Sequence, residues 1–276
     1  MNMSTRLAPL ALLLLVASVA GSAQIKRDTF AYKVGSRPVI SVRNQYGRIT
    51  VTPSTVDRVV VNVVHSDAVE ILHQQNENRI ELITGSQVAT GAKADNVDYQ
   101  VLVPADACVI LSTAAGSLSA ENLEGDLIFE GSTASVDARA LRNAHVHVKT
   151  LSGPITLREI QGGYVDVTTA SGEVSLQDVS GPMIEVHTGT GRIRYLGDPG
   201  QGFYKLVTGT GNIDVSVPFA GVAHFKTRSV KGKVDHQILG PALAGLGGTS
   251  SLLHNAAAAF EIRSLRGNIS VREASK

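Results

Sequence analysis

Hydrophobic residues recur along the middle of this chain in a fixed pattern. Two apolar residues two positions apart precede a glycine, and two more follow it, as expected for short strands joined at a corner. The clearest copies are four segments: 146–157, 165–176, 184–195 and 204–215. Each copy contains a pivot glycine: Gly153, Gly172, Gly191 or Gly211. Successive pivots lie 19, 19 and 20 residues apart, and a fixed period of this length predicts a stacked solenoid.

The same register extends beyond these four copies. Further pivots fit at Gly116, Ala134, Gly232 and Gly267, and Gly47 is an isolated earlier match. Because one unit cannot bury its own apolar face, neighbouring units must stack at the strand spacing of about 4.8 Å. We therefore predict an all-β, β-helix-like solenoid of about eight coils with a period of about 19 residues. An antiparallel sandwich is the alternative, but it does not require the same residue type at each period.

Two further positions repeat from coil to coil. A hydroxyl residue lies three positions before most pivots, and its parity places it inside, where we expect an internal ladder of hydrogen bonds. These residues are Thr113, Thr150, Thr169, Thr188, Thr208, Ser229 and Ser264, with Gly131 as the exception. Seven positions after the pivot, many coils have an apolar residue that we expect to plug the core: Leu123, Leu141, Ile160, Val179 and Leu239.

The two ends of the chain depart from the regular pattern. Strand-like runs in residues 24–105 are irregularly spaced, which predicts an N-terminal β capping region over the first open edge. Residues 106–276 form the predicted solenoid, and the two parts are expected to be one continuous domain. The 35-residue interval between Gly232 and Gly267 contains an excess rich in Gly, Ala and Ser, which predicts a loop insertion at 240–259.

The first residues resemble a targeting segment rather than part of the fold. Residues 1–23 contain Arg6, an apolar stretch and a small-residue end, a pattern typical of a cleaved secretory signal peptide. The apolar stretch is too short to favour a spanning helix, so we expect no integral membrane segment in the mature chain. The protein is therefore expected to be exported to the periplasm, the cell surface or the extracellular space.

Charge and cysteine content narrow the classes of partner and chemistry. Removal of residues 1–23 leaves 24 basic and 24 acidic residues, and this balance predicts no general attraction for nucleic acid or anionic lipid. Cys108 is the single cysteine and cannot form an internal disulfide. Its apolar surroundings favour a small buried hydrophobic residue over a reactive nucleophile.

Several segments together resemble a known family. They are RNQYGRITV at 43–51, the segment 99–125, the repeated T-x-S/T-G-x-I/V units and LRGNISVRE at 265–273. On these residues the chain resembles the bacterial putative-adhesin family of β-strand-repeat domains, a family of unknown function. The resemblance covers nearly all of residues 35–273. It implies a β-solenoid-like fold in an envelope or surface setting, and it supplies no catalytic residues.

One outward row contains the best candidate for metal binding. His147 shares its position with Asp166 and Glu185 in the next coils, so stacking would bring them together. Weak zinc or copper binding is conceivable there, but a metal site needs three or four converging ligands, and a solvated mixed-charge ladder is favoured. The TGTG segments are each followed by a strand rather than a helix, which argues against phosphate binding. Asp214 lacks the repeated acidic neighbours of a calcium-binding roll.

No arrangement in the sequence predicts catalysis. The outward carboxylates are scattered, without a repeated acid pair, and no nucleophile elbow or triad is recognisable. We therefore predict a noncatalytic, exported binding or presentation module of the cell envelope, with no catalytic, cofactor-binding or metal residues. Its expected partner is an envelope protein or glycan. The alternatives are an envelope-stress or regulatory scaffold that binds a membrane protein and, less favoured, a carbohydrate-active β-helix enzyme.

Overall fold

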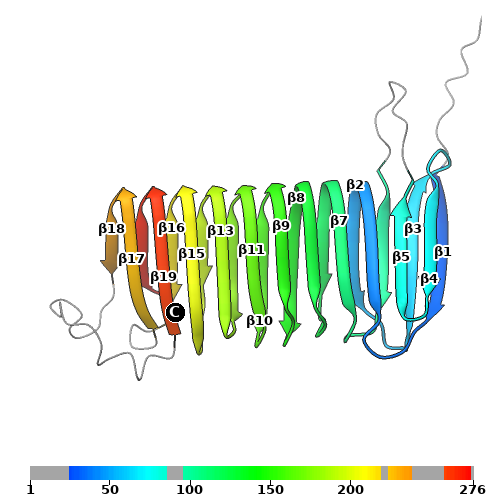
Figure 1. Cartoon of the computed structure of the whole chain (residues 1–276), viewed down its shortest axis with the longest axis horizontal. Coiled ribbons are helices and arrows are strands. Elements are labelled where there is room, and N and C mark those ends of the chain that lie inside the picture. The colour runs from blue at the N-terminus through cyan, green and yellow to red at the C-terminus, as the bar shows by residue number, and fades with distance from the viewer. Residues whose placement is uncertain (1–24, 86–95, 219–222, 238–257, 275–276) are drawn as a thin grey trace, which may run out of the picture.

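The computed structural model describes residues 25–85, 96–218, 223–237 and 258–274, and these residues form strands without any helix. Figure 1 shows the strands side by side along a rod. The predicted signal peptide and residues 240–257 of the predicted insertion lie outside the described residues, whereas Ala258 and Ala259 belong to a strand. The prediction of an all-β solenoid is confirmed.

Each central coil crosses two faces of the rod. β7 (Cys108–Glu121) and β8 (Leu127–Arg142) run through the pivot as single strands. Later coils divide there into two strands: β9 (Val146–Ser152) and β10 (Ile155–Gln161), β11 (Tyr164–Ser171) and β12 (Val174–Ser180), β13 (Met183–Thr190) and β14 (Ile193–Leu196), β15 (Gly202–Thr210) and β16 (Ile213–Val217). We call the surface formed before the pivots the leading face and the surface formed after them the trailing face.

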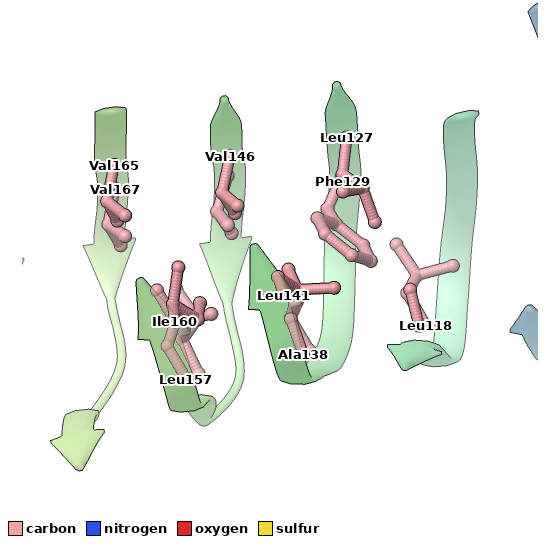
Figure 2. Packing of buried hydrophobic residues seen from close by; sticks show 14 of the residues in the cluster. Leu118, Leu127, Phe129, Ala138, Leu141, Val146, Leu157, Ile160, Val165 and Val167 are labelled. Atoms are coloured by element: carbon pink, nitrogen blue, oxygen red, sulfur yellow. The ribbon is translucent and has the colours of Figure 1, made fainter. Parts of the chain in front are cut away.

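The columns of the solenoid follow the predicted register. Val167 pairs with Val148 on one side and with Val186 on the other, and all of these strands are parallel. Inward residues of both faces meet in a buried core. Figure 2 shows Phe129 and Val146 of the leading face opposite Leu141 and Ile160 of the trailing face. Burial of this aliphatic surface is the main term that stabilises the stack, at about 25 cal/mol per Å².

The plug residues owe their inward direction to a repeated backbone irregularity. Leu123, Leu141, Ile160 and Val179 are fully buried, as predicted. The residue before each plug has positive φ, and the register skips it, as at a β-bulge: Asn122, Ala140, Glu159 and Asp178, with φ of 52–56°. This left-handed residue turns the chain so that the plug points inward. Leu239 lies outside the described residues.

The predicted hydroxyl ladder is also confirmed. Six of its members are buried: Thr113, Thr150, Thr169, Thr188, Thr208 and Ser264. The hydroxyl of Thr208 donates to the carbonyl of the pivot Gly191 in the neighbouring coil at 3.0 Å, and that of Thr150 donates to Thr169 at 2.9 Å. The hydroxyls therefore satisfy backbone and side-chain acceptors beside the corner, where water is excluded.

Gly153 is a pivot that both conformation and space require to be glycine. It has φ of 120°, and a Cβ atom added there would lie 2.1 Å from the carbonyl oxygen of Ala134 in the coil below. No side chain fits that gap. The pivot Ala134 is not among the residues with positive φ, and its corner accommodates a Cβ atom.

The N-terminal end contains more solenoid than the sequence predicts. β2 (Val39–Pro53) pairs in parallel with β7 along both faces, with Gly47 opposite Gly116, so Gly47 is the pivot of a further coil rather than an isolated match. β5 (Arg79–Thr84) and β6 (Asp98–Val103) stack in parallel on the other side of β2. The rod then ends in antiparallel strands: β3 (Arg58–Ser66), β1 (Ile25–Lys33) and β4 (Ile71–Asn76).

The C-terminal end departs from sequence order. Its strands are β17 (Ala223–Lys231), β18 (Val234–Gln237), β19 (Ala258–Arg266) and β20 (Ile269–Glu273). β19 pairs with β15 on one side and β17 on the other, and β20 pairs with β16 and β18. The coil that comes last in the sequence therefore lies inside the stack, as Figure 1 shows.

Candidate functional site

A ladder of charged side chains runs along the leading face. Its members lie six positions before the pivots and are in register across neighbouring strands, in the spatial order His147, Asp166, Glu185, Lys205, Glu261 and Lys226. We call this row the charge ladder. The charge ladder contains His147, Asp166 and Glu185, which the sequence predicts in one outward row. It continues beyond them to the end of the rod.

Two neighbouring pairs of the charge ladder lie within salt-bridge distance. His147 Nδ1 lies 3.0 Å from Asp166 Oδ2, and Lys205 Nζ lies 3.7 Å from Glu185 Oε1. His187, two residues along the same strand, also approaches Glu185, with 3.8 Å between Nε2 and Oε2. Because these side chains are 31–49% exposed, each pair adds little stability. The pairs hold the charges in fixed positions on a flat sheet.

The metal hypothesis for this row finds no support in the geometry. His147 is directed to Asp166, whereas Glu185 is directed to Lys205 and His187. Across the described ranges, no three His, Cys, Asp or Glu side chains converge as metal ligands would. Asp214 pairs with Arg192 at 3.5 Å on the other side of the corner, so its carboxylate also has a cationic neighbour.

A second polar cluster on the trailing face was not predicted from the sequence. The guanidinium of Arg158 donates two hydrogen bonds to Asp137 at 2.7 and 2.9 Å. One coil earlier, the guanidinium of Arg139 pairs with a single carboxylate oxygen of Glu121. Hydrogen bonding to Asp137 raises the pKa of Arg158 above its usual value. A shallow hollow of about 250 Å³ lies between these arginines and the left-handed residues Ala140 and Glu159.

A third cluster lies at the N-terminal end. The ring of His65 is 3% exposed, with Nε2 3.0 Å from Asp28 Oδ2 and Nδ1 2.7 Å from the carbonyl of Ser66. Lys26 approaches the same Asp28 oxygen at 3.0 Å. Hydrogen bonds from Lys26 and His65 lower the pKa of Asp28, which keeps this carboxylate ionised. The cluster ties β1 to β3 where the rod ends.

Cys108 corrects one expectation from the sequence. It was expected to be a small buried residue, but it is half-buried, because it occupies an outward position on β7 while Val109 points inward. Ala107, Val109 and Leu111 are fully buried, so Cys108 falls on the outward side of this alternation. The thiol is free.

The described residues include no helix that is long and apolar enough to cross a membrane.

Several solved structures are similar to this chain over most of its length. A putative adhesin from Parabacteroides distasonis ATCC 8503 is 11% identical, with 92% of this chain and 98% of that chain covered and a TM-score of 0.46. A putative adhesin from Bacteroides fragilis NCTC 9343 is 13% identical, with 90% and 97% covered and a TM-score of 0.35. A putative cell adhesion protein from Clostridium sporogenes ATCC 15579 is 11% identical, with 91% and 100% covered and a TM-score of 0.32.

The search of curated proteins finds no match to this chain. Residues 38–272 match the family described as Toastrack DUF4097, and this stretch runs from the residue before β2 to the last residue but one of β20. The matched stretch therefore contains all of the parallel coils together with β3 and β4. On this evidence, the protein is a member of the Toastrack DUF4097 family.

Proposed function

We propose that the protein is a noncatalytic, exported binding module that presents the charge ladder to another component of the bacterial cell envelope. The observation that carries this proposal is the ladder itself, a row of fixed charges of both signs on a rigid, flat sheet. Surfaces of this kind recognise extended partners through polar complementarity along their length. We propose an envelope protein or glycan as the partner.

The arrangement of these polar groups favours binding over catalysis. His147 lies 3.0 Å from Asp166 and Glu185 lies 3.7 Å from Lys205, on a face where these side chains are 31–49% exposed. An enzyme needs a water-excluding site in which nucleophile, base and stabilising donors converge. A flat face with satisfied charges instead suits reversible contact over several coils.

Retention on envelope material tests the proposal. The full chain is immobilised and exposed to detergent-solubilised envelopes and to purified cell-wall glycan. We expect retention of one envelope component, weakened about tenfold or more by D166N/E185Q, because two charges of the ladder are removed. The matched control D57N/E77Q removes two exposed carboxylates near the N-terminal end and should bind as the unchanged protein does.

The outcomes separate the candidate functions. Glycan retention lost in D166N/E185Q supports adhesion, and a stoichiometric membrane protein lost in the same variant supports a regulatory scaffold. Equal retention of D166N/E185Q and the unchanged protein would show that the charge ladder is not the binding surface. Release of reducing ends from the glycan, abolished by the same substitutions, would overturn the noncatalytic proposal.

A further inference from the structure

The leading face changes character over its last three strands. Basic residues collect on β17 and β19 and form a group that we call the basic patch: Lys226, Arg228, Lys231, Arg263 and Arg266. Arg228 lies in register beside Arg263, and Lys231 lies beside Arg266. All five side chains are exposed, and Glu261 is the acidic residue among them.

The positive charge of the basic patch is poorly compensated. Arg263 pairs with Glu261, whereas the other four side chains form no ion pair with any described residue. The adjoining sequences 219–222 and 238–257 contain no Asp or Glu. A chain that is nearly neutral overall therefore concentrates positive charge at one end of its rod.

Exposed aliphatic side chains lie in the middle of this charge. Val230 is 56% exposed and Leu265 is 53% exposed. Together with Val207, Arg228 and Arg263, they line a shallow hollow of about 290 Å³. Along both strands the aliphatic residue has an arginine two positions before it and a basic residue directly after it. The result is an apolar strip with bases on both sides.

Protection of an open edge does not account for the basic patch. Basic side chains on an edge strand prevent unwanted strand pairing, and β17 is such a strand. However, Arg263 and Arg266 belong to β19, which is paired on both sides. Edge protection therefore does not explain the basic residues of β19, which lie beside exposed aliphatic side chains.

We propose that the basic patch docks this end of the rod on an anionic phospholipid bilayer. Guanidinium and ammonium groups would contact lipid phosphates, while Val230 and Leu265 would enter the boundary between headgroups and acyl chains. The aliphatic strip decides between a lipid surface and a soluble polyanion, because a soluble polyanion gains nothing from exposed valine and leucine. The docking surface shares Lys226 with the charge ladder, but it lies on β17 and β19, apart from Asp166 on β11 and Glu185 on β13.

Vesicle co-sedimentation with the full chain tests the proposal. Vesicles contain phosphatidylcholine alone or with about one third phosphatidylglycerol. We expect binding to the anionic vesicles, weakened about thirtyfold by R228Q/R263Q, because each base near an anionic surface contributes about a factor of five or more. The matched control R27Q/K33Q removes two exposed bases of β1 at the opposite end and should bind unchanged. Any contribution of residues 1–23 is common to all variants.

A second pair of measurements distinguishes lipid binding from binding of soluble phosphate. It also distinguishes lipid binding from binding of the proposed envelope partner. V230S/L265S should weaken vesicle binding while leaving any binding of soluble polyphosphate unchanged. D166N/E185Q should keep full vesicle binding even where it loses the envelope partner. The proposal is overturned if R228Q/R263Q binds vesicles like the unchanged protein, or if V230S/L265S has no effect and polyphosphate binds as tightly as the vesicles do.

Discussion

The middle of the rod and its two ends follow different rules of assembly. From β8 to β16, each coil stacks on the coil that precedes it in the sequence. At the N-terminal end, β2 lies between β7 and the later pair β5 and β6. At the C-terminal end, β19 and β20 lie between coils that both come before them. The repeat therefore determines which positions share a column, but not which coils become neighbours.

The inserted coil separates like charges and completes an aromatic stack at the C-terminal end. Stacking in sequence order would place Lys205 beside Lys226, whereas Glu261 now lies between them. In the core, the ring of Phe260 stacks between Tyr204 and Phe225, with centroids 4.4 and 5.0 Å away. Among the described strands, those of the outermost coil pair with β19 and β20 alone, and this coil is largely exposed. Stability should accordingly be high in the middle coils and low at this edge.

The largest expected difference between middle and end concerns the pivot glycines. G153A should lower the free energy of unfolding by at least about 5 kcal/mol, because the new Cβ meets the Ala134 carbonyl and the backbone has positive φ. G232A meets the Gly267 carbonyl at 2.0 Å, but its coil is free to shift outward. Urea denaturation of both variants measures the difference. Equal losses would mean that the terminal coil is held as tightly as the middle.

A smaller contrast is expected for two aromatic residues in one stack. F260A should cost about 3–5 kcal/mol, since Phe260 is 1% exposed and packed on both sides. F225A removes a partly buried ring from the outermost coil and should cost less than half as much. The same denaturation experiment compares them. A larger loss for F225A would contradict the order of the coils at this end.

Alkaline pH should weaken both halves of the rod. Burial raises the pKa of Tyr99, near the N-terminal end, and of Tyr204, near the C-terminal end, each to about 12. Because the unfolded phenol ionises near pH 10, the stabilisation is complete below pH 10 and is lost as pH rises toward 12. Denaturation between pH 9 and about 12 should show this loss, reduced in Y99F and in Y204F. Stability that is constant over this range would refute it.

Much of the fold could be predicted from the sequence because the repeated positions have one physical role each. The column of Val148 and the buried hydroxyl of Thr208 follow from parity and residue type, and the plug Ile160 follows from the recurrence of an apolar residue at one position of the repeat. The order of the coils at the ends could not be predicted, since Gly232 and Gly267 fit the register equally well. The alternation of Lys205, Glu261 and Lys226 was the available signal for the inserted coil.

The polar surfaces were harder to predict than the core. The pairing of His147 with Asp166 follows from one shared row, but Asp137 and Arg158 come from positions two residues apart in neighbouring coils. The net charge of the chain does not reveal the basic patch, because acidic residues elsewhere in the chain balance its positive charge. The half-buried state of Cys108 was missed since an apolar run does not reveal which residue begins the alternation.

Disulfide formation between introduced cysteines tests most directly that the last coil in the sequence lies inside the stack. In a C108S background, K205C/E261C and K226C/E261C place the two cysteines on neighbouring strands in register, within the Cα separation that a disulfide allows. Both pairs should form a disulfide under mild oxidation, whereas K205C/K226C should remain reduced, because a strand separates its cysteines. Ready oxidation of K205C/K226C, with K205C/E261C left reduced, would contradict the account.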